Sequence, residues 1–313
     1  MTLTARNVQV DQALTNLSVA YKVEGLIWDI IVPKIPVVKD TGLYYEWSKS
    51  DDFRNYNGRD VRAPGAVSKT IDFSSSTKTY ATEDYALNVK ILDKEKKNAD
   101  SILNLEISKT NRLKGSLMLS REARIAWVFT NLNNYASSNK VTLSGTSQWD
   151  NASYAGNIVK ELDAWKEAVR KQIWRRPNTI IIPEAVADVM KNSASFIELL
   201  KYTKGDMLEN GDLPKVLRGM KVIIAGWVTN NANDGAADSI ADIWGKHVIM
   251  CYINYANPTI DEISFIYGFT SEDLTVRKWR EDPAKADVVE MEFSEDIKLI
   301  SNVAGYIIYN AIS

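Results

Sequence analysis

The sequence predicts an α+β protein, and three patterns along its 313 residues support that fold class. Residues 67–91 alternate apolar and polar side chains, which is the period of a β-strand. Residues 101–134 repeat their apolar side chains at helical spacing, and from residue 155 onward helix and strand patterns alternate before a closing series of strands. With 45% hydrophobic and 25% charged residues, the composition is that of a globular protein with a substantial core.

The charge and the rare residue types exclude several classes of function. The 38 basic and 40 acidic side chains leave a net charge of −2, too small a field to collect nucleic acid or anionic membrane. One Cys excludes an internal disulfide and a Cys-rich metal site, and one His excludes a multi-His zinc centre. We find no apolar run long enough to span a membrane and no signal-peptide layout, so we expect a soluble protein made in a reducing cytoplasm.

The first part of the chain reads as an extended arm followed by a strand. Each proline between Val32 and Val37 fixes its own φ and keeps the preceding residue out of the helical region. The aromatic stretch from Leu43 to Trp47 is typical of a strand.

A polar stretch, residues 48–65, then leads into a segment that we predict to be a projecting hairpin. Ile71 and Phe73 alternate with polar residues in one limb, and residues 85–91 alternate in the other, with a turn at Ser74–Ser76. The outer half has few large apolar side chains, so burial within its own domain cannot hold it.

The next segment, residues 101–134, is the strongest helix prediction in the chain. Its apolar residues fall within a sector of roughly 160° and the helix would run about 45–50 Å. Arg121 lies near the middle of that sector, where an unpaired charge is costly, so we expect it to reach the domain edge or meet a carboxylate. Glu122 is not the expected partner, because adjacent helical residues diverge.

The second half of the chain predicts an α/β unit and returning strands. A helix ends near Trp174, the apolar run Thr179–Ile182 indicates a strand buried on both faces, and Pro183 opens another helix. Further strands are expected at 220–228, 247–253, 263–267, 274–279, 288–293, 297–303 and 305–312. Residues 229–245 read as a long loop, whose turn-forming residues are Asn230, Asn231, Asn233, Asp234 and Gly235.

The residue patterns predict no catalytic, cofactor or metal site. Phosphate-loop, dinucleotide and nucleophile-elbow motifs are absent from the sequence. His247 and Cys251 fall on one strand about 13 Å apart, beyond hydrogen-bond reach. The sequence also holds a basic cluster, formed by Arg170, Lys171, Arg175 and Arg176. Such a cluster is typical of the last turn of a helix, and contact with phosphate is the alternative interpretation.

The order of these elements resembles the major capsid proteins of tailed bacteriophages, which have the Hong Kong 97-type fold. The resemblance covers nearly the whole chain and is carried by the order of short stretches rather than by one motif. These stretches are Ile31–Val37, Arg62–Gly65, Arg121–Glu122, Arg176–Ile182, Ile197–Thr203, Ile243–Lys246, Val276–Trp279 and Gly305–Ile308.

The resemblance implies a domain plan and a function. It implies an N-terminal arm and first strand (1–47), an extended hairpin loop (48–91), a peripheral domain with a spine helix (92–154 and 271–313) and an axial domain (155–270).

It further implies a non-enzymatic virion protein, assembled in the cytoplasm of a bacterial host, that forms hexamers and pentamers of an icosahedral shell around double-stranded DNA. The implied partners are other copies of the chain, a scaffold, a portal, decoration proteins and non-specifically packaged DNA, with no cofactor and no membrane. Because no long helical scaffolding segment precedes the arm, we expect a mature form or a separate scaffold. The candidate inter-subunit contacts are Arg59, Arg62, Lys69, Asp72, Lys78, Glu83, Asp84, Arg121 and Glu122.

Two alternatives remain open at this point. An encapsulin-like compartment would share the fold and enclose enzymes, although relatives of that kind begin with a helix. A hydrolase built on the α/β unit lacks a nucleophile–base pair in this sequence. A flat shell subunit should expose clearly more surface than the roughly 13,000 Å² of a compact protein of this mass.

Overall fold

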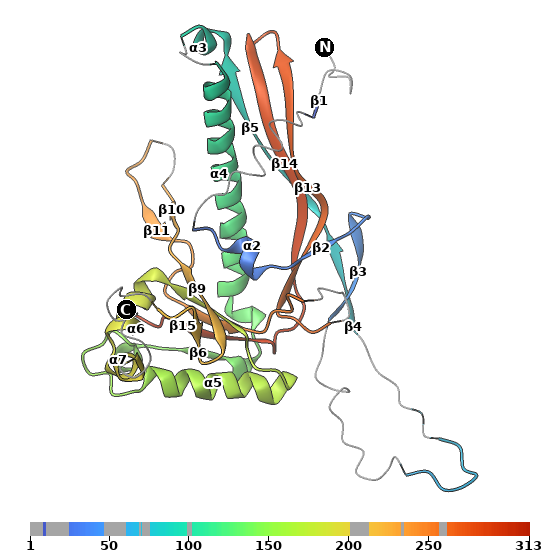
Figure 1. The fold of residues 1–313 in the computed structure, drawn as a ribbon, viewed down its shortest axis with the longest axis vertical. Coiled ribbons are helices and arrows are strands. Elements are labelled where there is room, and N and C mark those ends of the chain that lie inside the picture. Colours follow the sequence, from blue (N-terminus) through green and yellow to red (C-terminus); the bar gives the residue numbers. More distant parts are fainter. Residues whose placement is uncertain are drawn as a thin grey trace.

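A computed structural model describes residues 9–10, 25–46, 61–68, 70, 76–98, 102–200, 213–232, 235–256 and 262–313. One long helix runs beside a long antiparallel sheet, and a mixed α/β unit lies at one end of both (Figure 1). The predicted α+β class is therefore confirmed.

The spine helix α4 spans Ile102–Thr130. Its 29 residues correspond to about 44 Å, slightly shorter than predicted, because the helix ends four residues early and is followed by a short 3₁₀ turn, Leu132–Asn134. Leu113, Leu117 and Met118 pack in the core beneath the long sheet, whereas Ile125 and Phe129 belong to the core of the α/β unit. One helix thus links both parts of the molecule.

The long sheet has the strand order β1–β13–β14–β5, and β2 pairs with β13 in parallel. Its strands are β1 (Gln9–Val10), β2 (Lys34–Pro36), β5 (Glu83–Leu92), β13 (Ile266–Glu281) and β14 (Ala286–Leu299). Short strands at 263–267, 274–279, 288–293 and 297–303 were predicted where two long ones occur. Irregular pairing between Thr270 and Thr275 interrupts the alternation of β13, which explains why the sequence pattern divides it.

The α/β unit is built on a second sheet of order β6–β15–β12–β7–β9–β8. Its strands are β6 (Lys140–Thr142), β7 (Thr179–Pro183), β8 (Val216–Leu217), β9 (Met220–Ala225), β12 (Val248–Cys251) and β15 (Gly305–Tyr309), and its helices are α5 (Ile158–Ile173), α6 (Glu184–Asn192) and α7 (Ala194–Leu200). Every residue of β7 is buried, which confirms the prediction of a strand covered on both faces.

The predicted hairpin within residues 67–91 is wrong in its pairing. Strand β4 (Ser76–Ala81) pairs with β3 (Thr41–Glu46), and β5 pairs along its whole length with β14. The second predicted limb is therefore part of the long sheet, where Ile91 is fully buried. Alternation identifies the buried face of a strand but not its neighbour, so the error lies in the assumed partner. Ile71 and Phe73 lie outside the described residues.

The predicted loop at residues 229–245 is partly an exposed β-ribbon. Strand β10 (Val228–Asn230) pairs with β11 (Ile240–Asp242), and the Asn230 side-chain oxygen accepts bonds from the backbone N–H groups of Ala232 (3.0 Å) and Ser239 (2.9 Å). Asn231 and Gly235 continue this segment, whereas Asn233 and Asp234 lie outside the described residues.

The molecule exposes far more surface than a compact protein of its mass. Its accessible surface is 18246 Å², against about 13,000 Å² expected for 35.2 kDa. The surface is therefore larger than that of a compact protein, as the sequence predicted. Within the described ranges, no helix is long and apolar enough to cross a membrane.

Candidate assembly site

Arg121 on the spine helix forms a buried ion pair with Glu295 of β14. Its Nε lies 2.9 Å from Glu295 Oε1, its Nη2 bonds the other carboxylate oxygen, and the two side chains are 7% and 2% exposed. The guanidinium also lies over the rings of Trp28, at 3.8 Å from the centroid, and Phe293, at 4.9 Å. The prediction that Arg121 meets a carboxylate is confirmed.

Glu122, only 1% exposed, joins three regions of the chain. Its carboxylate accepts bonds from the backbone N–H groups of Ile27 (3.3 Å) and Trp28 (2.9 Å) at the start of helix α2 (Trp28–Ile31). Its other oxygen accepts the indole N–H of Trp244 at 2.7 Å. Burial raises the pKa of Glu122, and these three bonds act in the opposite direction. The N-terminal arm and the α/β unit are therefore both attached to the spine helix at one residue.

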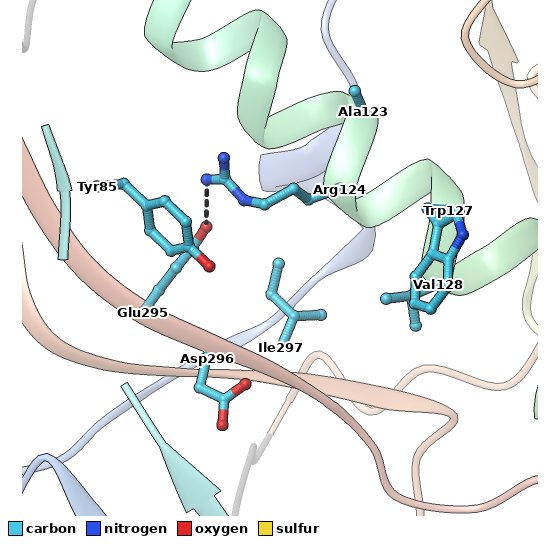
Figure 2. Close-up of a pocket in the computed structure, with 8 residues that line it drawn as sticks. All are labelled: Tyr85, Ala123, Arg124, Trp127, Val128, Glu295, Asp296 and Ile297. Carbon is cyan, nitrogen blue, oxygen red and sulfur yellow. Dashed lines mark ion pairs between the residues drawn. The ribbon is translucent and has the colours of Figure 1, made fainter. Parts of the chain in front are cut away.

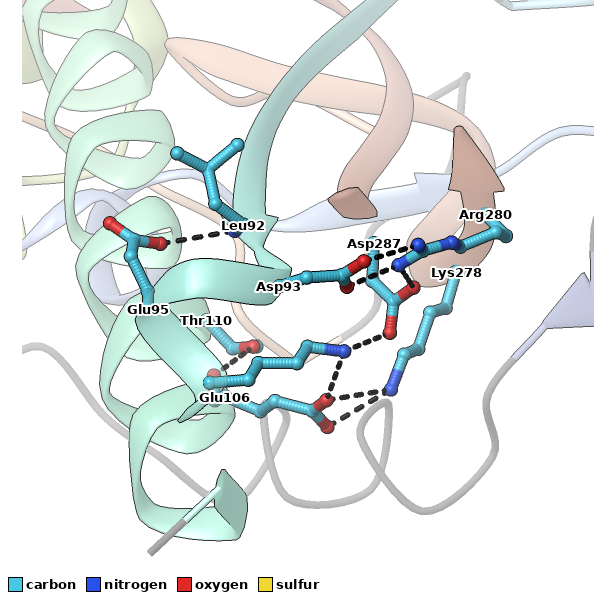
Figure 3. Close-up of polar contacts among 9 residues, drawn as sticks. Leu92, Asp93, Glu95, Glu106, Thr110, Lys278, Arg280 and Asp287 are labelled. Carbon is cyan, nitrogen blue, oxygen red and sulfur yellow. Dashed lines mark hydrogen bonds and ion pairs between the residues drawn. The ribbon is translucent and has the colours of Figure 1, made fainter. Parts of the chain in front are cut away.

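The far end of the long sheet carries a network of charges that the sequence did not reveal (Figure 3). Arg280 of β13 binds Asp93 with two 2.6 Å bonds and Asp287 of β14 at 3.2 Å. Lys278 donates to both carboxylate oxygens of Glu106 on α4 at 3.0 Å, and Lys96 of helix α3 (Asp93–Asn98) pairs with Asp287 and Glu106. The network fastens α3 and the start of α4 to the tip of the β13–β14 hairpin.

Several predicted inter-subunit residues have partners within their own chain. Lys78 pairs across the β3–β4 ribbon with Glu46 at 2.6 Å, Glu83 accepts the Tyr85 hydroxyl at 3.0 Å, and Asp84 bonds the Ser294 hydroxyl. Arg121 and Glu122 are buried in the subunit interior, so the structure gives them an internal role rather than a place on an assembly surface. Arg59, Lys69 and Asp72 lie outside the described residues.

Arg62 lies in an exposed turn, residues 61–68, drawn well away from the body of the molecule (Figure 1). Its Nε donates to the carbonyl oxygen of Ala66 at 2.5 Å, and Ala66 N–H donates to Ala63, so the turn bonds with itself. Val61 and Val67 are 81% and 94% exposed.

The residues with possible chemistry have structural surroundings. His247 stacks on Tyr309 with 3.9 Å between centroids and accepts the Asn310 N–H at 3.1 Å, and burial lowers its pKa to about 4. Cys251 is buried in β12, which raises the pKa of its thiol. In the described part of the chain, no three His, Cys, Asp or Glu side chains are grouped to hold a metal.

The basic cluster is also partly paired. Arg170 binds Glu167 on its own helix, with Nε at 2.7 Å, and Arg175 donates to the Tyr252 hydroxyl at 2.8 Å. This favours the interpretation of these residues as a cationic helix end over a phosphate site.

Comparison with known proteins identifies the family. No family profile matches the chain. It is 28% identical over 307 residues to the major capsid protein of Burkholderia phage BcepMu, covering 96% of this chain and 95% of that one. It is 27% identical over 249 residues to the major capsid protein of Pseudomonas phage JBD67, covering 78% and 77%. The chain is a phage major capsid protein of the Hong Kong 97-type fold.

Solved structures agree with this identification. The capsid protein shares its fold with a phage-related protein from Bordetella bronchiseptica RB50, with a TM-score of 0.74, 23% identity and coverage of 96% and 97% of the two chains. A subunit of the mature capsid of bacteriophage PhiM1 gives a TM-score of 0.60 at 8% identity, covering 93% and 88%. The protein is thus a structural component of the virion that forms an icosahedral phage head.

These similarities give less support to the two alternatives, an encapsulin-like compartment and an α/β hydrolase. The encapsulin of Synechococcus elongatus PCC 7942 shares the fold at a TM-score of 0.51 and 12% identity, covering 96% and 95% of the chains. The curated relatives are capsid proteins, and the match to them includes the arm, spine helix and long sheet that an α/β hydrolase would lack.

Proposed function

We propose that the capsid protein assembles into hexamers and pentamers that enclose double-stranded DNA without sequence-specific contacts. The proposed domains are the arm and first strand (1–47), the extended loop (48–91), the peripheral domain (92–154 and 271–313) and the axial domain (155–270). A near-neutral net charge of −2 suits a shell that surrounds DNA without binding it tightly. A scaffold, a portal and decoration proteins are further proposed partners.

The observation that carries the assembly proposal is the contrast between the two ends of the extended loop. At its base, Tyr44 and Tyr80 of the β3–β4 ribbon are buried against Phe269, with Tyr80 stacked at 4.6 Å between centroids. At the exposed turn 61–68, the two valines have no such cover. A two-stranded ribbon is marginal alone in water, so the far end requires a partner, and a neighbouring subunit is the partner that assembly supplies.

Charged side chains would anchor the loop on that neighbour. Arg59 and Arg62 are the proposed anchors, because a guanidinium can hold a carboxylate with two bonds. Lys69 and Asp72 offer further charge pairing.

The β10–β11 ribbon is proposed to lie near the centre of each capsomer. Val228 and Ile240 are exposed on one face of this ribbon, whereas β9 and β12 on either side are part of the buried sheet. The ribbon can therefore adapt to rings of five or six while the sheet stays fixed.

Removal of the turn tests the assembly proposal. Deleting residues 68–80 would also remove Tyr80 from the core, so residues 61–68 are the better target. A variant with those eight residues replaced by Gly and Ser should remain a folded subunit by circular dichroism and form no shells by electron microscopy. Normal particles from this variant would contradict the proposed role of the loop.

A further inference from the structure

We propose that a pocket between the spine helix and β14 receives an aspartate from the loop of a second copy of the chain. This inference rests on the proposed function, because it requires that the part of the extended loop between β3 and β4, residues 47–75, contacts a neighbouring subunit. The pocket has a volume of about 460 Å³ and is shown in Figure 2. It is lined by Tyr85, Ala123, Arg124, Trp127, Val128, Glu295, Asp296 and Ile297.

Trp127 forms the apolar side of the pocket. It lies on the solvent side of α4 and is 67% exposed, although Val128 beside it packs against the core. Exposed tryptophans beside a concave surface are characteristic of binding hot spots, since the ring offers a large contact area with few rotatable bonds.

Arg124 forms the polar side. Its guanidinium lies 3.6 Å from the centroid of the Tyr85 ring, and its Nη2 is 3.6 Å from Glu295 Oε1. Within the described part of the chain, neither Nε nor Nη2 has a hydrogen-bond acceptor. Glu295 is already held by Arg121 through both oxygens. Hydrogen bonds therefore do not fix the Arg124 guanidinium, which can turn to bind an incoming carboxylate.

The two acidic side chains that line the pocket each have a partner other than Arg124. Glu295 is neutralised by Arg121, and Asp296 accepts the Ala81 N–H at 2.7 Å and pairs with Lys298 at 3.1 Å. Arg124 is the basic residue among those that line the pocket, and in this partly desolvated site a carboxylate would be attracted to it more strongly than in water.

The loop of a second copy supplies the matching chemistry. Its sequence places an aspartate directly before an apolar side chain at Asp52–Phe53, Asp60–Val61 and Asp72–Phe73, so one dipeptide could reach both Arg124 and Trp127. The described turn of that loop lies well away from the α4 helix of its own subunit (Figure 1). Shell assembly brings a second loop to this surface.

Charge exchange tests the proposal in the full-length protein. Arg124→Glu should abolish shells by electron microscopy, whereas Arg112→Glu, an exposed arginine on the same helix outside the pocket, should assemble as the unaltered chain does. Arg124→Glu is then combined in turn with Asp52→Arg, Asp60→Arg and Asp72→Arg, and the combination that changes the bound aspartate should restore shells. Failure of all three combinations would overturn the proposal.

Trp127→Ala provides a second test that does not depend on charge. Because this side chain is mostly exposed, the subunit should keep its melting temperature. The affinity between one loop and one pocket should fall by about thirtyfold, and shells should be lost. Shells from Trp127→Ala or from Arg124→Glu would contradict the pocket assignment alone. An absence of shells from the unaltered chain would instead contradict the proposed function.

Discussion

At the scale of single residues, Glu122 holds together the arm, the spine helix and the α/β unit. Its three donors come from Ile27, Trp28 and Trp244, far apart in sequence. Its raised pKa means that the folded protein binds a proton more tightly than the unfolded chain does. The contribution of Glu122 to stability should therefore fall as pH rises from about 4.5 through the raised folded pKa.

Glu122→Gln tests the direction of this pH dependence. The free energy of unfolding of the unaltered protein minus that of the variant should decrease as pH increases from about 4.5 to 7, since only the carboxyl group becomes charged. Urea unfolding at several pH values measures the difference. A difference that is constant, or that grows with pH, would show that burial does not dominate the titration.

Glu295→Ala tests the buried pair with Arg121. Removing one partner leaves a buried guanidinium without its counter-charge, at an expected cost of about 3–5 kcal/mol. The double variant Arg121→Met, Glu295→Leu removes the buried guanidinium together with its carboxylate and leaves only Arg124, whose side chain is 31% exposed, without that partner. It should therefore be less destabilised than Glu295→Ala in the same denaturant titration. Equal losses in the two variants would mean that packing, rather than charge, sets the cost.

At the scale of elements, the network around Arg280 fastens α3 to the hairpin tip. Its side chains are partly exposed, so salt should screen it. Raising the salt concentration to about 1 M should speed amide exchange in α3 and at the tip of β13–β14, but not in β7. In Arg280→Gln the same amides should exchange fast at every salt concentration; a salt effect that persists in this variant would exclude the network as its source.

The sequence predicted elements better than their pairing. Apolar periodicity located α4 and α5, because each buries one face, and a continuous apolar run located β7, which is buried throughout. It could not show that β5 pairs with β14, because alternation is the same for any partner. The sequence predicted that Arg121 needs a partner, because it lies in the apolar sector of the helix, where an unpaired charge is costly. Glu295, 174 residues away, was not identifiable as that partner, since the chain has 40 acidic side chains.

At the scale of the whole molecule, the chain is an open subunit with a long sheet and spine helix, an α/β unit at one end and an exposed turn drawn away from both (Figure 1). The internal ion pairs at Arg121 and Arg280 hold this shape within one chain. The exposed turn 61–68 and the pocket beside Trp127 remain available for other copies. The residues that stabilise the subunit are therefore distinct from the residues proposed to join subunits.

Cryo-electron microscopy of particles formed by the full-length chain tests this separation most directly. We expect closed icosahedral shells in which residues 61–68 lie on an adjacent subunit, while Arg121 and Glu122 stay buried within their own. Shells in which that turn folds back onto its own subunit, or in which Glu122 contacts a neighbour, would contradict it.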